Sequence, residues 1–242
     1  MKVSLPLCFA LINQDAAFSG TIIGLGKYPA VTLPPSILDQ AQHHAGSLQS
    51  SGQRMLVLRT GSATEGRSVA MAIADKLNTR PVFIETEALT GLGPWLQVRQ
   101  LTPVFCLDLA PGERYRLSPI PFYDGPILAL CGPDGSIEAP GITALNWRLS
   151  VPPKTERETL WQQALGDADL AKKLAHCHRH GSGRIAQLGN LAHHYAQLHA
   201  HSSPSEEDVA VAAWAGEGVG LDALAQPLTE RIEEPALVLP SR

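Results

Sequence analysis

Short apolar runs and amphipathic segments alternate along the chain as far as Val151. Each apolar run is long enough for one buried strand, and the runs cover residues 55–58, 80–85, 102–109, 126–131 and 142–151. Val69, Ala72, Ile73 and Leu77 recur at helical spacing after the first run, and further helices are expected over 36–45 and 87–99. Strands separated by helices in this order predict an α/β fold with a mainly parallel sheet flanked by helices.

The pattern changes after Pro152 and Pro153, where amphipathic segments follow one another without apolar runs. Capping residues and helical spacing predict helices over 155–165, 167–180, 183–199, 205–215 and 221–232. We therefore expect an N-terminal apolar segment over 1–27 and an α/β core over 28–153. An all-helical domain over 154–232 and a tail over 233–242 are expected to follow.

The loop after the first predicted strand carries the pattern of a phosphate-binding loop. It reads Gly61-Ser62-Ala63-Thr64-Glu65-Gly66-Arg67-Ser68, in which two glycines flank four residues and precede a basic residue and a serine. Backbone N–H groups of such a loop turn toward phosphate oxygens, and the following helix adds its partial positive charge. Arg67 stands where the pattern has Lys, and its planar guanidinium cannot take the place of a compact ammonium. The alternative, a chance spacing in a glycine-rich chain, stays open.

Asp108 is the candidate catalytic residue and magnesium ligand. It lies at the end of an apolar strand, and an acidic side chain at the carboxyl edge of a parallel sheet can face a metal ion beside bound phosphates. Ser68 is the second candidate magnesium ligand, because the hydroxyl at this loop position binds the ion in phosphate loops. A turn residue that ends the strand before Ala110 and Pro111 is the alternative for Asp108.

The composition is that of a globular protein, with 44% hydrophobic and 17% charged residues. A net charge of −4 argues against a general nucleic-acid-binding protein. Cys8, Cys106, Cys131 and Cys177 lack paired spacing, which indicates free thiols in a reducing compartment and predicts a cytoplasmic protein. No stretch approaches the roughly 20 apolar residues of a membrane span. A secretory signal is the alternative for the apolar start, but Pro6 and the lack of a clear cleavage site favour a buried or partner-facing segment.

Seven of the nine histidines lie between His176 and His201. Together with Cys177 they could form a zinc site, but their spacing gives no matched Cys/His pairs. The alternative is a set of solvated side chains on helix surfaces. A serine hydrolase is not supported, because no Gly-x-Ser-x-Gly elbow occurs.

The order of these features resembles the AAA+ ATPase family over roughly residues 33–225. A phosphate loop after the first core strand, an Asp-ended strand and a helical domain follow one another as in that family. The prolines before Glu156-Arg157 resemble the family's junction into a helical lid. Gly181-Ser182-Gly183-Arg184-Ile185 resembles the lid motif whose Arg reaches the terminal phosphates, which implies this role for Arg184. Arg157 and Arg184 could equally be surface residues or form salt bridges within the module. Within the family, the chain resembles the single-module proteins encoded with phage-tail-like contractile assemblies.

The resemblance implies a P-loop NTPase-like fold that binds ATP or ADP with Mg²⁺, forms a homo-oligomer and acts in assembly or remodelling of a protein partner. Arg67 in place of Lys and Leu109 in place of the catalytic Glu predict a weak or lost ATPase activity. The alternative is a noncatalytic scaffold or interaction protein that keeps the fold without binding nucleotide. An open, donor-lined loop would favour nucleotide binding, and a loop filled by side chains would favour the scaffold.

Overall fold

The computed structural model describes residues 8, 10–11, 18, 20–26, 28–49, 54–85 and 91–215. Contacts group Met1–Asn190 into one compact unit and Leu191–Arg242 into a second. No described helix is long and apolar enough to cross a membrane. The domain boundaries expected from the sequence stay predictions. The predicted helix over 221–232, the tail and much of the segment over 1–27 lie outside the described residues.

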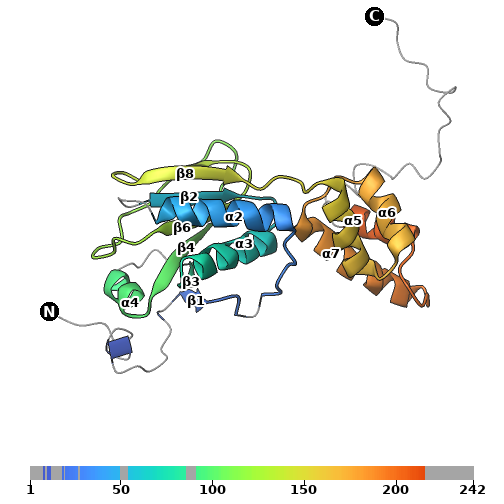
Figure 1. Cartoon of the computed structure of the whole chain (residues 1–242), viewed down its shortest axis with the longest axis horizontal. Helices are drawn as coiled ribbons and strands as arrows, with labels where there is room; N and C mark the ends of the chain where they lie inside the picture. Colours follow the sequence, from blue (N-terminus) through green and yellow to red (C-terminus); the bar gives the residue numbers. More distant parts are fainter. Residues whose placement is uncertain are drawn as a thin grey trace, which may run out of the picture. The chain divides into compact units, whose positions relative to one another are not determined.

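A six-stranded sheet forms the centre of the first unit (Figure 1). Its strands in spatial order are β1 (Thr21–Ile23), β3 (Arg80–Ile84), β4 (Leu101–Leu107), β6 (Ile127–Cys131), β2 (Arg54–Arg59) and β8 (Thr143–Arg148). Every neighbouring pair is parallel except β1 with β3. The predicted α/β class is therefore confirmed, and the strands expected from the apolar runs are present. β1 and the separate parallel pair β5 (Arg114–Arg116) and β7 (Ser136–Glu138) are additional, because three residues give too short a pattern to recognise.

Each face of the sheet is covered, which explains why its strands are apolar at consecutive positions. On one face Leu56 and Leu58 of β2 pack in a cluster with α2 (Pro35–Leu48) and α3 (Ala63–Lys76). On the other face Met55 and Val57 belong to a cluster with Trp95 of α4 (Leu92–Val98). Figure 1 shows α2 and α3 lying along the sheet. This packing fixes the start of α3 at the carboxyl end of β2.

Helices follow β8, as the sequence predicts: α5 (Lys154–Leu165), α6 (Ala168–Cys177), α7 (Ser182–Leu198) and α8 (Glu206–Ala215). Arg157 of α5 is buried, and its guanidinium donates to the carbonyl oxygens of Pro152 at 2.7 Å and Ala175 at 2.8 Å. Arg157 therefore ties α5 to the last turn of α6, where carbonyl groups lack helical partners. From the sequence a salt bridge was considered for Arg157, and the structure shows hydrogen bonds to backbone carbonyl oxygens.

Glu156 joins α5 to α2 of the sheet layer. Its carboxylate accepts hydrogen bonds from the Ser36 backbone N–H at 3.1 Å and from the Ser36 hydroxyl at 2.5 Å. Ser36 lies in the first turn of α2, where free N–H groups and the helix dipole favour a negative charge. The Glu156 side chain thus caps a neighbouring helix, and α5 itself begins after Pro153 without a side-chain cap.

Candidate functional site

The predicted phosphate loop and Asp108 follow the carboxyl ends of strands in the same sheet. Arg59 of β2 is paired with Cys131 of β6, which is paired in turn with Leu107 of β4. Thr60 and Asp108 therefore leave the sheet at the same edge, with β6 between them. This edge is where parallel sheets place their ligands. Asp108 is exposed there, and it belongs to no cluster of three His, Cys, Asp or Glu side chains with metal-binding spacing among the described residues.

Most of the predicted loop is helical. α3 begins at Ala63, six residues before Val69, the first residue of the predicted helical spacing, so residues 63–68 form its first turns. Ser62 is the N-cap, and its hydroxyl accepts a hydrogen bond from the Glu65 backbone N–H at 3.3 Å. Ser62-x-x-Glu65 is the sequence of a capping box, which was the signal for this earlier helix start.

Three backbone N–H groups of the predicted loop donate hydrogen bonds to Thr60 or to Ser62. The N–H of Ser62 donates to the Thr60 hydroxyl at 3.1 Å, and the N–H of Gly66 donates to the Ser62 carbonyl at 3.0 Å. The N–H of Glu65 is the donor to the Ser62 hydroxyl. In a phosphate loop such groups would point at phosphate oxygens. Here they build the cap of α3.

The Glu65 side chain lies at the N-terminus of α3 and is only 6% exposed. Its carboxylate accepts hydrogen bonds from the Thr60 hydroxyl at 3.0 Å and from the buried hydroxyl of Ser182 at the start of α7. The positive end of a helix is a general anion site. In this chain an internal carboxylate, that of Glu65, already lies in the first turn of α3.

The start of α7 packs directly on this carboxylate. A Cβ atom added to Gly183 would lie 2.2 Å from the Ser62 hydroxyl oxygen and 2.8 Å from the Glu65 Cβ atom. Gly181 is close as well, since its added Cβ atom would lie 3.3 Å from a Glu65 carboxylate oxygen. The glycines of the Gly181-Ser182-Gly183 motif therefore permit close contact between α7 and the cap of α3. We name Thr60, Ser62, Glu65, Ser182 and Gly183 the Glu65 cluster.

The two glycines of the phosphate-loop pattern have different surroundings. A Cβ atom added to Gly61 would have no heavy atom within 4 Å. A Cβ atom added to Gly66 would lie 3.0 Å from Thr60 Cγ2 and 3.4 Å from a Leu130 methyl carbon. Gly66 is thus a packing position between α3 and β6, which accounts for a glycine without reference to phosphate.

Arg67 points into the protein among aromatic and polar side chains. Its guanidinium carbon lies 3.5 Å from the ring centroid of Tyr28, and Nη2 lies 3.3 Å from a carboxylate oxygen of Glu85. Nη2 also lies 3.9 Å from the Cys106 sulfur, and Nη1 is buried without a hydrogen-bond partner. Burial disfavours the charge, but the contacts with Tyr28, Cys106 and Glu85 outweigh it and raise the pKa of the guanidinium above its ordinary value. Arg67 is a buried cation with partners of its own.

The remaining predicted site residues also have local partners. The Ser68 hydroxyl accepts a hydrogen bond from the Val31 backbone N–H at 2.9 Å, which ties α3 to the segment before α2. Arg184 donates from Nη1 to the Gln187 side chain at 3.0 Å. Ala63 and Thr64 are the first two residues of α3, and the Thr64 hydroxyl lies 3.0 Å from that of Ser62. Magnesium binding by Ser68 and Asp108, and phosphate sensing by Arg184, stay predictions.

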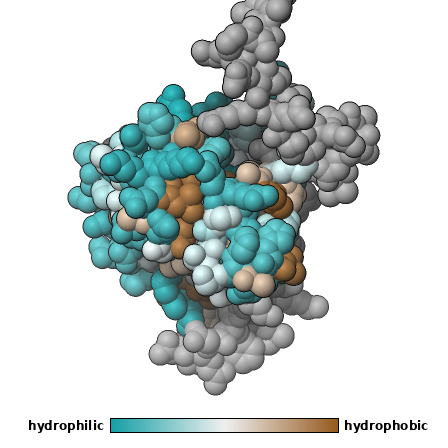
Figure 2. Space-filling model, turned by 90° about the vertical axis from the view of Figure 1, so that its right-hand side faces the viewer, coloured by the Kyte–Doolittle hydropathy of each residue, from teal (hydrophilic) through white to brown (hydrophobic). Residues whose placement is uncertain are grey.

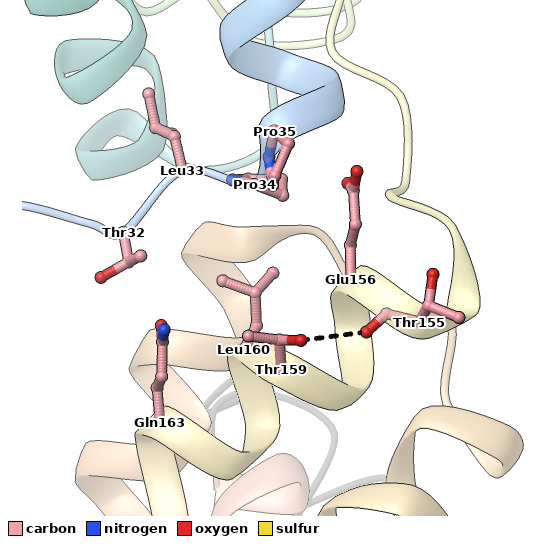
Figure 3. A pocket seen from close by; sticks show the side chains of 9 residues that line it. All are labelled: Thr32, Leu33, Pro34, Pro35, Thr155, Glu156, Thr159, Leu160 and Gln163. Atoms are coloured by element: carbon pink, nitrogen blue, oxygen red, sulfur yellow. Dashed lines mark hydrogen bonds between the residues drawn. The ribbon is translucent and has the colours of Figure 1, made fainter.

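A cleft of about 250 Å³ lies between the segment before α2 and helix α5 (Figure 3). One wall comes from Thr32, Leu33, Pro34 and Pro35, and the other from Thr155, Glu156, Thr159, Leu160 and Gln163. Its lining contains no cation, and its one carboxylate, that of Glu156, already accepts hydrogen bonds from Ser36. The cleft therefore offers an apolar surface without a charge that would hold phosphates. The sequence pattern gave no sign of it, because the two walls are far apart in the chain.

No family model and no curated protein matches the chain. Among solved structures, RuvB of Thermotoga maritima, described as a Holliday junction branch migration motor, is 11% identical over 74% of this chain and 67% of that chain, with a TM-score of 0.44. A point mutant of the same protein is 12% identical over 78% and 72%, with a TM-score of 0.48. ORC2 of Aeropyrum pernix, in ADPNP and ADP complexes, is 13% identical over 82% and 74%, with a TM-score of 0.43. All three TM-scores lie below 0.5, so these similarities carry no argument about function.

Proposed function

We propose that this chain is a noncatalytic interaction module that keeps an AAA+-type ATPase fold and does not use nucleotide. The observation that carries this proposal is the Glu65 cluster. Its carboxylate lies at the N-terminus of α3, is nearly buried, and is held from two sides by Thr60 and Ser182. The alternative weighed from the sequence, a scaffold with a filled loop, agrees with this geometry better than an open phosphate site does.

Electrostatics oppose phosphate binding beside Glu65. Two negative unit charges about 4 Å apart repel by about 4 kcal/mol at an effective dielectric constant of 20. A phosphate would also have to displace the Ser182 hydroxyl and the Gly183 backbone from the cap. The helix dipole that would favour the phosphate already stabilises the internal carboxylate.

Hydrolysis is disfavoured by two further residues. Arg67 is engaged by Tyr28 and Glu85, so its charge is not available to a terminal phosphate. Leu109, which follows Asp108 where the family has a catalytic Glu, is 8% exposed and lies close to Gly135. An apolar side chain at that position cannot polarise an attacking water. We therefore expect no ATPase activity above background.

The partner is proposed to be a protein, either further copies of this chain or a component of a phage-tail-like contractile assembly. The net charge of −4 disfavours a nucleic-acid partner. In the face drawn in Figure 2, hydrophilic side chains predominate and the hydrophobic atoms form small separate areas. Such a surface suits polar, reversible contacts better than a broad apolar interface. A cytoplasmic location accords with the four described cysteines being free.

The second candidate function is nucleotide binding without hydrolysis, and the cleft of Figure 3 is the observation that favours it. Val31 precedes Thr32, which lines the cleft, and the Val31 backbone N–H donates a hydrogen bond to the Ser68 hydroxyl of α3. In this mode the base would lie in the cleft and the phosphates at the Glu65 cluster. Binding would then require that the Ser182 to Glu65 hydrogen bond open, whereas the first candidate needs no rearrangement.

Sedimentation and phosphate release test the proposal together. The full chain is centrifuged at several concentrations without nucleotide, with ATP and Mg²⁺, and with ADP and Mg²⁺. We expect the same distribution of species in all three conditions and no phosphate release above a buffer control. Assembly that depends on ATP, or turnover that Asp108→Ala abolishes, would contradict the proposal.

A further inference from the structure

His199, His201 and Asp208 are brought together in the second unit, where the chain turns from α7 into α8. α7 ends at Leu198, and Ala200 has a φ of 58°. The N–H of His201 donates to the Ala196 carbonyl at 2.8 Å, and the N–H of Ala200 donates to the Gln197 carbonyl at 3.2 Å. This is the hydrogen-bond pattern of a Schellman motif, which places His199 at the end of the helix and His201 two residues later. The backbone thus holds both imidazoles on one side of the turn.

Asp208 approaches the same point from the first turn of α8. The Ser205 backbone N–H and hydroxyl donate to its Oδ2 atom at 2.8 Å and 2.7 Å, and the Asp208 N–H donates back to the Ser205 hydroxyl at 3.2 Å. These reciprocal bonds form a capping box and fix the carboxylate orientation. Asp208 is 1% exposed, while each of the two histidine side chains is about half exposed. The cluster therefore has an ordered inner carboxylate and two imidazoles open to solvent.

The spacing of these side chains suits a metal ion. His199 Nδ1 lies 3.0 Å from Asp208 Oδ1, and His201 Nδ1 lies 3.3 Å from Asp208 Oδ2. The ligand atoms of the three residues all lie within 4.8 Å of one another. Ligands about 2.0–2.2 Å from a tetrahedral Zn²⁺ are separated by roughly 3.3–3.5 Å. The two nitrogen-to-oxygen distances therefore already lie close to the separations of zinc ligands.

We propose that His199, His201 and Asp208 form a binding site for a divalent transition-metal ion, with Zn²⁺ the best match. Two imidazole nitrogens and one carboxylate oxygen form a donor set that binds Zn²⁺ in preference to Mg²⁺ or Ca²⁺, which take oxygen ligands. The Ser205 bonds would orient the carboxylate, as outer hydrogen bonds do in zinc proteins. Solvent would complete the coordination, because both imidazoles are exposed. This site is independent of the proposed function. The zinc site considered from the sequence included Cys177 and seven histidines, whereas the proposed site uses only His199, His201 and Asp208.

Zinc titration of the full chain tests this site. After chelator treatment and dialysis, Zn²⁺ is titrated against the chain in competition with a chromophoric chelator. We expect one ion per chain, and at least tenfold weaker affinity in His199→Gln and in His201→Gln. The matched control is the double variant His178→Gln with His180→Gln, which removes a second His-x-His pair with ring centroids 5.5 Å apart. This control should bind Zn²⁺ as the unmodified chain does.

Spectroscopy of the unmodified chain makes the test independent of variant folding. Co²⁺ at the site should give the visible absorption bands of a low-coordinate nitrogen and oxygen environment, and Zn²⁺ should displace it. Absence of stoichiometric Zn²⁺ binding, equal affinity in the His199 and His201 variants, or equal loss in the His178 and His180 control would each overturn the proposal. In those cases the imidazoles serve only as hydrogen-bond partners of Asp208.

Discussion

A carboxylate at the start of a helix is stabilised by the same partial charge that attracts a phosphate, and Glu65 holds that position in α3. Its two side-chain partners, Thr60 and Ser182, come from different parts of the chain. Arg67, two residues later, is held by Tyr28 and Glu85. At the scale of single residues, therefore, both charged side chains of the predicted phosphate loop have partners inside the protein.

Ser182→Ala tests the hydrogen bond that closes the Glu65 cluster. The variant leaves the buried carboxylate without one donor, and hydrogen bonds to charged groups contribute about 1.5–3 kcal/mol. We expect the free energy of unfolding, measured by urea denaturation, to fall by this amount. Ser118→Ala, at an exposed serine, is the control and should change it by less than about 0.5 kcal/mol. Equal effects of the two changes would argue against a structural role for the Ser182 hydroxyl.

Arg67→Lys introduces the lysine of the phosphate-loop pattern and tests whether this lysine allows ATP to bind. The ammonium cannot both stack on Tyr28 and pair with Glu85, so we expect a loss of about 1–2 kcal/mol in unfolding free energy. We also expect no gain of ATP binding in calorimetry, because Glu65 stays in place. Arg80→Lys, at an exposed arginine, is the control for the substitution itself. Saturable ATP binding by Arg67→Lys alone would show that Arg67, and not Glu65, blocks the site.

At the scale of helices and strands, contacts between helix ends connect parts of the first unit that are far apart in the sequence. α7 reaches the cap of α3 through Ser182 and Gly183, and α5 reaches the cap of α2 through Glu156. Glu156 accepts a hydrogen bond from a backbone N–H of the first turn of α2, whereas Ser182 donates its hydroxyl to the carboxylate in the first turn of α3. Within the first unit, α5 and the start of α7 are thus attached to helices of the sheet layer by interactions at their capped ends.

Glu156→Ala tests the connection between α5 and α2. It removes the acceptor for the Ser36 N–H and hydroxyl, and we expect a loss of about 1–2 kcal/mol in unfolding free energy. Glu158→Ala on the same helix is the matched control, because Glu158 only approaches Lys154 at 3.8 Å near the surface. The control should cost less than about 0.5 kcal/mol. If Glu158→Ala costs as much as Glu156→Ala, the cap of α2 does not connect the helices.

At the scale of the whole molecule, local patterns predicted the class of fold but not the state of the loop. The apolar run 126–131 was correctly predicted to be a strand, because a strand of a sheet that is covered on both faces is apolar at consecutive positions. The spacing of Gly61 and Gly66 was interpreted as a phosphate loop, although Ser62-x-x-Glu65 within it also has the sequence of a capping box, and Ser62 is the N-cap of α3. The deciding partner, Ser182, lies 117 residues from Glu65, and no local pattern contains such a pair. Strands of three residues, such as β1, were missed for want of length.

The measurement that tests the account most directly is calorimetric titration of the full chain with ATP and with ADP, each with Mg²⁺. Because the Glu65 carboxylate lies in the first turn of α3 and is held by Thr60 and Ser182, we predict no saturable heat at millimolar nucleotide, with the protein folded by circular dichroism. Saturable one-to-one binding that is lost in a folded Gly66→Asp variant would contradict the account and establish a working phosphate loop.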